Sequence, residues 1–251
     1  MSEAAETTGS LLGGRIVYSQ PRAGFRSGIE PVLLAAAVPA RGQERVIEAG
    51  CGAGAGLLCL AARLPGIGGH GIERDPALAA LAARNIAANG WTARLSVAAG
   101  DITAPPVTTP PMDGALFDHA CANPPWHDRA ATPSPHPARR AAKIADADLL
   151  AQWVAALALR LRRRGSLTLI LPAGQLGRAL AAAGAAGFGA ASLLPLWPRA
   201  GRPARLILLQ MLKGAPAGER VLPGLVLHGE AGGFTEAAEA ILRNGAGLPL
   251  R

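Results

Sequence analysis

The feature that most constrains the fold is a glycine-rich turn between an apolar stretch and an alanine- and leucine-rich one. Residues 48–56 read EAGCGAGAG. The residues before the turn, 44–49, predict a short strand, and residues 54–64 predict a helix. Glycines at such a strand-to-helix turn let the backbone come close to a bound cofactor. The turn therefore predicts an α/β fold with a cofactor site at the carboxyl end of its first strand.

The alternation of strand and helix continues along the chain. Strands are expected at residues 70–75, 94–101, 116–122 and 166–171, and helices at 76–89, 146–164 and 175–186. Two strands without a helix between them, 192–197 and 204–212, should pair antiparallel. This order predicts a doubly wound, Rossmann-like α/β sheet of about seven strands, parallel except for a terminal antiparallel strand. We expect residues 1–14 to be a flexible N-terminal tail and residues 15–251 a single domain.

Composition excludes several classes of protein. Half of the 251 residues are apolar and 17% are charged, which is too much apolar material for a disordered chain. Three cysteines without a CxxC pair indicate neither a disulfide framework nor a metal site. The N-terminus lacks a secretory pattern, and glycine and proline interrupt the uncharged residues 179–198, which we expect to be a helix end, a turn and a buried strand. We therefore expect a cytoplasmic protein, a monomer or weak homodimer, with no metal and no membrane partner.

Acidic residues follow the predicted strands where a nucleotide-like cofactor requires them. Glu73 lies 23 residues after Gly50, where a carboxylate can accept hydrogen bonds from a ribose, and Asp101 can meet an adenine amino group. Glu48, before the first glycine, favours S-adenosylmethionine, because an acid suits its positively charged methionine end better than a pyrophosphate. A nicotinamide cofactor stays open, since the glycine pattern also fits a dinucleotide. The expected cofactor contacts are Glu48, Gly50, Gly52, Gly54, Glu73 and Asp101.

The tetrapeptide at residues 123–126, Asn-Pro-Pro-Trp, closes the fourth predicted strand. An amine conjugated to a ring, or an amide nitrogen, is a poor nucleophile because its lone pair is delocalised. The side-chain oxygen of Asn123 and the carbonyl of Pro124 can accept its N–H hydrogens and so localise that lone pair. Pro124 and Pro125 stiffen the turn, and Trp126 offers a face on which a planar base can stack. These four residues predict a catalytic site for methyl transfer to nitrogen, with Asn123 beside the cofactor as well.

The positive charge is concentrated in one stretch. The formal net charge is +8, and residues 139–205 carry nine more basic than acidic residues, whereas the rest of the chain sums to −1. A basic field confined to one stretch is typical of a surface that binds the phosphates of RNA. The candidate RNA contacts are Arg139, Arg140, Lys143, Arg199, Arg202 and Arg205.

With these motifs the chain resembles the class I S-adenosylmethionine-dependent N-methyltransferases that carry an Asn-Pro-Pro-aromatic motif. It is most similar to the bacterial tRNA1(Val) adenine-N6 methyltransferase family, from about Phe25 to Gly247. Residues 26–34, RSGIEPVLL, are similar to that family's basic-x-Gly-Thr-Asp-Gly-x-Leu-Leu segment, with Ile29 in place of threonine. The resemblance implies that Arg26 and Glu30 lie against the methionine end of the cofactor.

The resemblance also implies the reaction, which is methyl transfer to adenine N6 in a tRNA anticodon loop. Protein glutamine N5-methyltransferases of the release-factor type are an alternative, because they share the tetrapeptide. A non-enzymatic RNA-binding protein with a degenerate cofactor fold is a third hypothesis.

Overall fold

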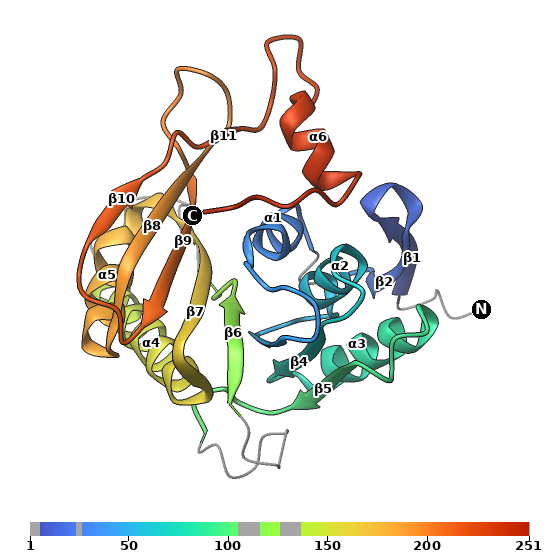
Figure 1. The fold of residues 1–251 in the computed structure, drawn as a ribbon, viewed down its shortest axis with the longest axis horizontal. Coiled ribbons are helices and arrows are strands. Elements are labelled where there is room, and N and C mark those ends of the chain that lie inside the picture. Colours follow the sequence, from blue (N-terminus) through green and yellow to red (C-terminus); the bar gives the residue numbers. More distant parts are fainter. Residues whose placement is uncertain (1–5, 24–26, 105–115, 126–136, 251) are drawn as a thin grey trace.

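The computed structural model describes residues 6–23, 27–104, 116–125 and 137–250, without the side chains of residues 137–148. Its main sheet consists of β3 (Arg45–Ala49), β4 (Gly68–Glu73), β5 (Leu95–Ala99), β6 (Phe117–Ala122), β7 (Leu161–Pro172), β8 (Phe188–Trp197), β9 (Leu206–Lys213), β10 (Glu219–Val221) and β11 (Leu225–Val226). The strand order is β10-β8-β9-β7-β6-β3-β4-β5, with β11 also beside β8 (Figure 1). Of these nine strands, β9 alone runs antiparallel to its neighbours, β7 and β8. The predicted sheet is confirmed, and two short strands extend it.

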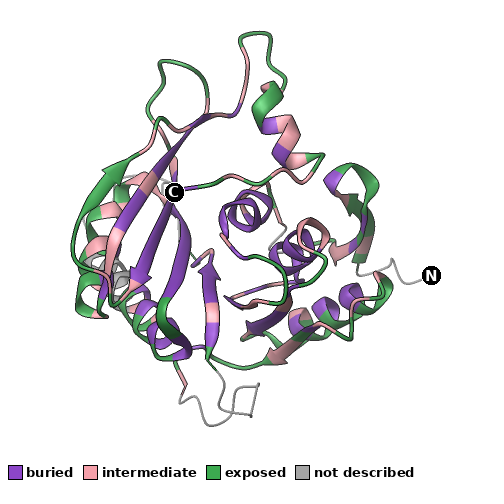
Figure 2. Cartoon of the chain, in the orientation of Figure 1, coloured by how far each residue is buried: buried purple, intermediate pink, exposed green. Residues whose placement is uncertain are grey.

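Helices cover both faces of the sheet. They are α1 (Glu30–Ala37), α2 (Ala55–Arg63), α3 (Pro76–Ala88), α4 (Pro137–Arg160), α5 (Leu176–Ala185) and α6 (Glu236–Leu242). One apolar cluster packs α1, α2, α3 and α6 against the sheet, and a second packs α4 and α5 against it (Figure 2). Local signals place the helix ends: Asp75 accepts a hydrogen bond from the N–H of Ala77 at the start of α3, and Pro76 occupies its first position.

The boundary between α4 and β7 differs from the prediction. The sequence predicts a helix as far as Arg164, but the helix ends at Arg160, and Leu161 already pairs with Phe117 of β6. Arg162 forms an ion pair with Asp118, whose carboxylate lies 2.6 Å from Nε. The carboxylate of Asp118, on a neighbouring strand and distant in sequence, therefore favours a strand rather than a helix end at Arg162.

The uncharged residues 179–198 form the end of α5 and then β8, as predicted. Within the described ranges, no helix is long and apolar enough to cross a bilayer.

The prediction of a flexible tail over residues 1–14 is wrong for its described part. Strand β1 (Glu6–Leu11), the short 3₁₀ helix η1 (Leu12–Gly14) and strand β2 (Ile16–Pro21) form a hairpin. Ile16 and Tyr18 of β2 are buried in the cluster around α1 and α2. Their burial gives the hairpin a packed face, which explains why this polar segment is ordered.

Asn85 of α3 and Asn89, which caps the end of this helix, bind the free edge of β2. The side chain of Asn85 accepts from the N–H of Ser19 (2.9 Å) and donates to its carbonyl (2.8 Å). Asn89, one helical turn later, makes the same pair of bonds with Val17. Asn85 also donates to the carbonyl of Ala53 at 2.9 Å, so one buried amide joins the hairpin to the glycine turn. These amides take the place of a neighbouring strand.

We predict that Asn85→Ala lowers the free energy of unfolding by about 2 kcal/mol, because it leaves the buried carbonyl of Ala53 and the partly buried N–H and carbonyl of Ser19 without partners. Asn89→Ala is the matched control. It removes a similar pair of bonds at a more exposed position, where water replaces them, and should cost less than about 1 kcal/mol. Urea unfolding of both variants measures the difference, and equal losses would contradict a special role for Asn85.

Candidate functional site

The carboxyl ends of the parallel strands bring the predicted residues together. Strand β3 pairs with β6 in a register that places Ala49 opposite Ala122. Gly50 and Asn123, the next residue on each strand, therefore begin their two loops side by side. Asn123 is half-buried, Pro124 is buried and Pro125 is exposed. Trp126 lies outside the described residues, so its predicted stacking role stays a prediction.

The glycine turn needs glycine for its backbone conformation. Gly50, Gly52 and Gly54 have φ angles of +63°, +55° and +89°. Residues with a Cβ rarely adopt such positive φ angles, whereas glycine does so without steric cost. The N–H of Gly50 donates to the carbonyl of Ile72 at 2.8 Å and fixes the start of the turn on β4. Among the described residues other than its two chain neighbours, no heavy atom lies within 4 Å of the position that a Cβ of Gly52 would take. The turn is thus anchored at its start and open at its middle, where a cofactor can approach.

Glu73, at the end of β4, is joined to this turn. One carboxylate oxygen accepts from the N–H of Gly52 at 2.9 Å, and the other accepts from the N–H of Asp75 at 2.9 Å. A carboxylate offers about four acceptor positions, so two remain for a ligand. Asp101, exposed beyond β5, accepts from the hydroxyl and N–H of Thr103 on one oxygen, and these bonds lower the pKa of Asp101. Both side chains offer carboxylate oxygens as hydrogen-bond acceptors at the edge where the predicted cofactor would lie.

Glu48 lies under the turn instead of lining its open side. It is 4% exposed, and one oxygen contacts Gly56, where any side chain would collide with it. The N–H of Leu57, at the start of α2, donates to the carboxylate, while Oε2 has no partner in the described part of the chain. Burial raises the pKa of Glu48 to about 8 and outweighs the helix N–H, so the group is protonated at neutral pH. Its contact with a cofactor stays a prediction.

Some site residues have no strong signal in the sequence. Trp153 of α4, which the helical spacing predicts to be a core residue, is half-buried, and a Cβ on Gly50 would lie 2.6 Å from its ring. Tyr18 of the hairpin donates to or accepts from Ser27 at 2.8 Å, next to the segment with similarity to the methyltransferase family. A single tryptophan in an amphipathic helix, or a tyrosine in a polar N-terminus, does not reveal these contacts.

Glu30 occupies the first position of α1. Its carboxylate folds back over Gly28 and occupies the space that a Cβ of residue 28 would take. Ile29 packs against the apolar cluster. Arg26 lies outside the described residues, and its predicted cofactor contact stays a prediction.

The basic residues separate into groups with different surroundings. Arg199, Arg202 and Arg205 are all exposed in the turn between β8 and β9, at the same sheet edge as Asn123. Arg178 is exposed as well. It lies five residues after Ala173, whose N–H donates to the carbonyl of Arg205 and so joins the two segments. Arg139, Arg140 and Lys143 lie on the first turns of α4, and their side chains are outside the described part of the structure.

Other arginines of the basic stretch do not belong to this surface. Arg160 is buried and donates to the carbonyls of Ala156 and Ala104. Arg162 is paired with Asp118 at the opposite, amino edge of the sheet. The continuous basic field predicted from the sequence is therefore smaller in space.

The residues present fit S-adenosylmethionine. The open turn at Gly52, the spare acceptor positions of Glu73 and Asp101, and the half-buried Asn123 lie along one edge of the sheet. Among the described side chains, no group of three or more histidine, cysteine or acidic residues could hold a metal ion.

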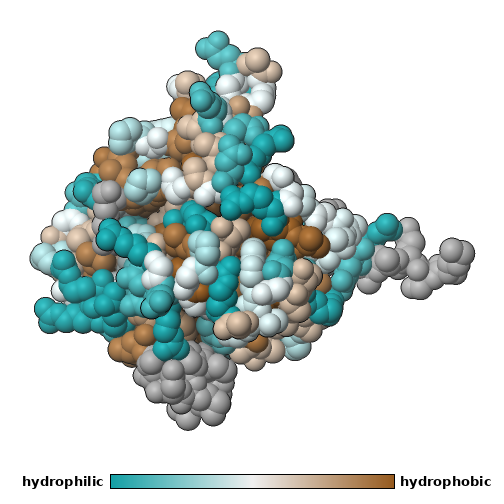
Figure 3. Space-filling model, turned by 45° about the vertical axis from the view of Figure 1, so that its right-hand side comes forward, coloured by the Kyte–Doolittle hydropathy of each residue, from teal (hydrophilic) through white to brown (hydrophobic). Residues whose placement is uncertain are grey.

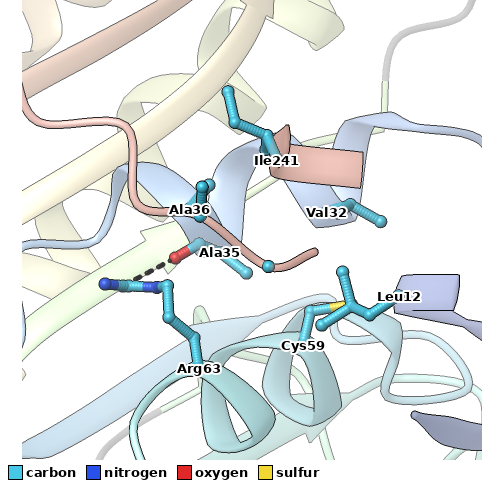
Figure 4. A pocket seen from close by; sticks show the side chains of 9 residues that line it. Leu12, Val32, Ala35, Ala36, Cys59, Arg63 and Ile241 are labelled. Carbon is cyan, nitrogen blue, oxygen red and sulfur yellow. Dashed lines mark hydrogen bonds between the residues drawn. The ribbon is translucent and has the colours of Figure 1, made fainter. Parts of the chain in front are cut away.

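A small void lies between helices on one face of the sheet. It lies between α1, α2 and α6 and has a volume of about 10 Å³. Arg63 lines it and donates to the carbonyls of Ala35 and Val38 (Figure 4). Its volume is near the limit for one water molecule. On the face drawn in Figure 3, hydrophilic and hydrophobic residues are intermixed.

The chain is similar to curated bacterial enzymes. It is 32% identical over 162 residues to tRNA1(Val) (adenine(37)-N6)-methyltransferase of Actinobacillus succinogenes, covering 64% of this chain and 66% of the relative. An enzyme of the same name from Yersinia pestis is 33% identical over 108 residues, or 44% of its length. The alignments thus span from under half to just under two thirds of these relatives. No protein-family model matches the chain.

Solved structures share the fold. A crystal structure from Agrobacterium tumefaciens, described as a predicted O-methyltransferase, has a TM-score of 0.72 and 25% identity and covers 88% of this chain and 98% of its own. A SAM-dependent O-methyltransferase from Thermotoga maritima has a TM-score of 0.53 and 17% identity, with coverage of 79% and 69%. The predicted class I methyltransferase fold is confirmed.

We predict that Glu48→Gln changes how stability depends on pH. The pKa of Glu48 is raised above its ordinary value of 4.5 to about 8 by burial, so the folded state holds a proton that the unfolded state has lost. Its contribution to stability is complete below pH 4.5 and is lost as the pH rises to about 8, at up to about 1.4 kcal/mol per pH unit. Glutamine does not titrate and should remove this loss.

Urea unfolding of both proteins across this pH range measures the difference in their free energies of unfolding. The contributions of the histidines are the same in both proteins and cancel in this difference. A difference between wild type and variant that stays constant with pH would contradict a protonated, buried Glu48.

Proposed function

We propose that this chain is an S-adenosylmethionine-dependent methyltransferase that methylates adenine N6 in tRNA, at an anticodon-loop base. The observation that carries the proposal is the pairing of β3 with β6, which sets Asn123 beside Gly50. A hydrogen-bond acceptor for the target amine thereby adjoins the turn that holds the cofactor. The names of the curated relatives support the same reaction.

Several residues would hold the cofactor. The backbone of the turn at Gly50, Gly52 and Gly54 lies against the cofactor, and the carboxylate of Glu73 accepts hydrogen bonds from the ribose hydroxyls. Asp101 accepts from the adenine amino group, and Arg26 and Glu30 face the methionine end. When bound, S-adenosylmethionine supplies a sulfonium methyl that the N6 nitrogen takes, which leaves S-adenosylhomocysteine and one proton.

The tetrapeptide orients the target amine. The oxygen of Asn123 and the carbonyl of Pro124 accept the two N6 hydrogens and turn the nitrogen lone pair toward the methyl group. Pro124 restricts Asn123 to an extended conformation, so the acceptors need little reorganisation during the reaction. The face of Trp126 stacks on the adenine, which has to leave its own stack and does so most cheaply in a loop.

The surface beside this site suits RNA better than a protein substrate. Arg199, Arg202 and Arg205 lie at the carboxyl edge in the turn between β8 and β9, and β9 is two strands from β6. Two strand spacings correspond to roughly 10 Å. Phosphates next to a flipped adenine therefore reach these guanidinium groups, and Arg139, Arg140 and Lys143 extend the contact on α4.

We predict that Asn123→Ala lowers the rate of methyl transfer to tRNA by roughly a hundred- to a thousandfold, the usual cost of one preorganised transition-state contact. Asn123→Asp keeps the shape and an acceptor and should fall between alanine and wild type. Single-turnover assays at saturating cofactor separate the chemical step from binding. Calorimetry with S-adenosylmethionine is the control and should give similar affinities. A near-normal rate for Asn123→Ala, or transfer to a glutamine peptide in place of tRNA, would contradict the proposal.

We predict that replacing Arg199, Arg202 and Arg205 with alanine weakens tRNA binding and lowers the slope of log affinity against log salt by about 2 to 3. The matched control replaces Arg41, Arg163 and Arg164, which are equally exposed but lie at the opposite edge of the sheet. Filter binding at several salt concentrations measures both. Equal effects of the two triple variants would show that only total charge matters.

A further inference from the structure

A pair of stacked rings lies beside the turn at residues 199–205, the arginine turn, which the proposed function assigns to RNA. The rings of His228 and Phe234 have their centroids 4.7 Å apart and their planes at 22°. Both residues are half-buried, so part of the pair stays in solvent. Phe, Trp and Tyr make up only 4% of the chain, which makes a partly exposed ring pair a feature that calls for an explanation.

Backbone hydrogen bonds fix the pair next to the arginine turn. The N–H of His228 donates to the carbonyl of Pro198 at 3.1 Å, and the N–H of Leu227 donates to the carbonyl of Trp197 at 2.8 Å. These bonds continue the parallel pairing of β11 with β8. The ring pair therefore begins beside the residue that precedes Arg199. The turn that carries the pair and the arginine turn both extend beyond the carboxyl edge of the sheet, at the top of Figure 1.

The turn that carries the pair is held in shape by its own contacts. The N–H of Gly229 donates to the carbonyl of Gly233 at 2.9 Å, and the hydroxyl of Thr235 donates to the carbonyl of Val226 at 2.6 Å. Phe234 packs against the apolar cluster around α1 and α6, and the imidazole stacks on its ring. A surface that is already formed loses little conformational entropy when a ligand binds to it.

The charges around the pair favour a base over a phosphate as its ligand. The guanidinium groups of the arginine turn attract the RNA backbone to this part of the edge. Glu230, within the turn of the ring pair, and Glu236, at the start of α6, are exposed acids that disfavour a phosphate at the rings themselves. An uncharged planar group is the part of an RNA that stacked rings bind.

The distance from Asn123 indicates that this base is not the methylated one. Strand β8, which carries Trp197 at its end, is three strands from β6. Three strand spacings correspond to roughly 15 Å. This exceeds the roughly 3.4 Å between stacked bases along one strand several times. A different nucleotide of the same RNA therefore meets the ring pair while the target adenine lies at Asn123.

We propose that His228 and Phe234 form a stacking platform for a second, unpaired base of the RNA substrate. Proteins recognise single-stranded RNA loops by stacking splayed bases on aromatic side chains, histidine included. The platform would add a contact to the base itself next to the phosphate contacts of the arginine turn. The inference rests on the proposed RNA substrate, although not on the role of Asn123 in the reaction.

Two variants of His228 test the platform by filter binding of tRNA. His228→Ala removes one ring and should weaken tRNA binding at least about fivefold, the lower end of the usual cost of one lost stacking contact. His228→Phe is the matched control, which keeps a ring that stacks and should bind almost like wild type. Stacking releases no counterions, so neither variant should change the slope of log affinity against log salt. Calorimetry with S-adenosylmethionine checks that both variants fold.

Stem-loops with a single abasic nucleotide identify the base that stacks. At one loop position other than the target adenine, loss of the base should weaken binding to wild type by about the same factor as His228→Ala. The same abasic stem-loop should bind His228→Ala no more weakly than the intact stem-loop does, because the contact is already absent.

Unchanged tRNA affinity in His228→Ala, or equal losses in both variants, would overturn the proposal. A loss in His228→Ala that no abasic position reproduces would overturn it as well. Methyl transfer by the same proteins reports on the proposed function separately. Wild type that binds tRNA without methylating it would contradict the proposed reaction alone, whereas wild type that binds no tRNA would overturn both.

Discussion

The pairing of β3 with β6 is the interaction on which the rest of the site depends. The two strands are distant in sequence, and their register sets the glycine turn and Asn123 side by side. A shift of one residue would turn every side chain of β6 to the opposite face and move the loop after it. The apolar residues of both strands prevent such a shift, because Ile47 and Ala120 are fully buried on one face. Core packing thereby fixes the geometry of the polar site.

Much of this arrangement could be predicted because it follows from local signals. Proline and glycine mark the ends of α3, and three glycines at alternate positions of the turn indicate the positive φ angles that they adopt. Parallel strands end at one edge, so residues that follow them must meet there. That rule is sufficient to place Asn123 next to Gly50, although it gives no distances.

Other features could not be predicted, because long-range contacts decide them. Glu48 reads as an acid that faces a cofactor, but α2 begins directly over it and burial keeps it protonated. Arg162 reads as the end of a helix, but Asp118, 44 positions earlier in the chain, holds it in a strand. The hairpin is predicted to be a flexible tail, because its contacts with Asn85 and Asn89 at the end of α3 join it to residues more than sixty positions away. Each of these features depends on packing or on a polar partner that hydrophobic periodicity does not reveal.

The arginines show why net charge overstates the surface available for RNA. Arg63 and Arg94 donate to carbonyls near the ends of α1 and α2, and Arg160 does so within α4. Burial lowers the pKa of each of these groups, as expected when a cation loses water and gains only neutral acceptors. A planar group with five donors can satisfy several carbonyls at once, which a lysine cannot do with the same geometry. Part of the positive charge thus serves to satisfy carbonyl groups at the ends of helices. The exposed guanidinium groups at the carboxyl edge are fewer, so the proposed recognition of an RNA loop has to come from the residues around Asn123 as well as from charge.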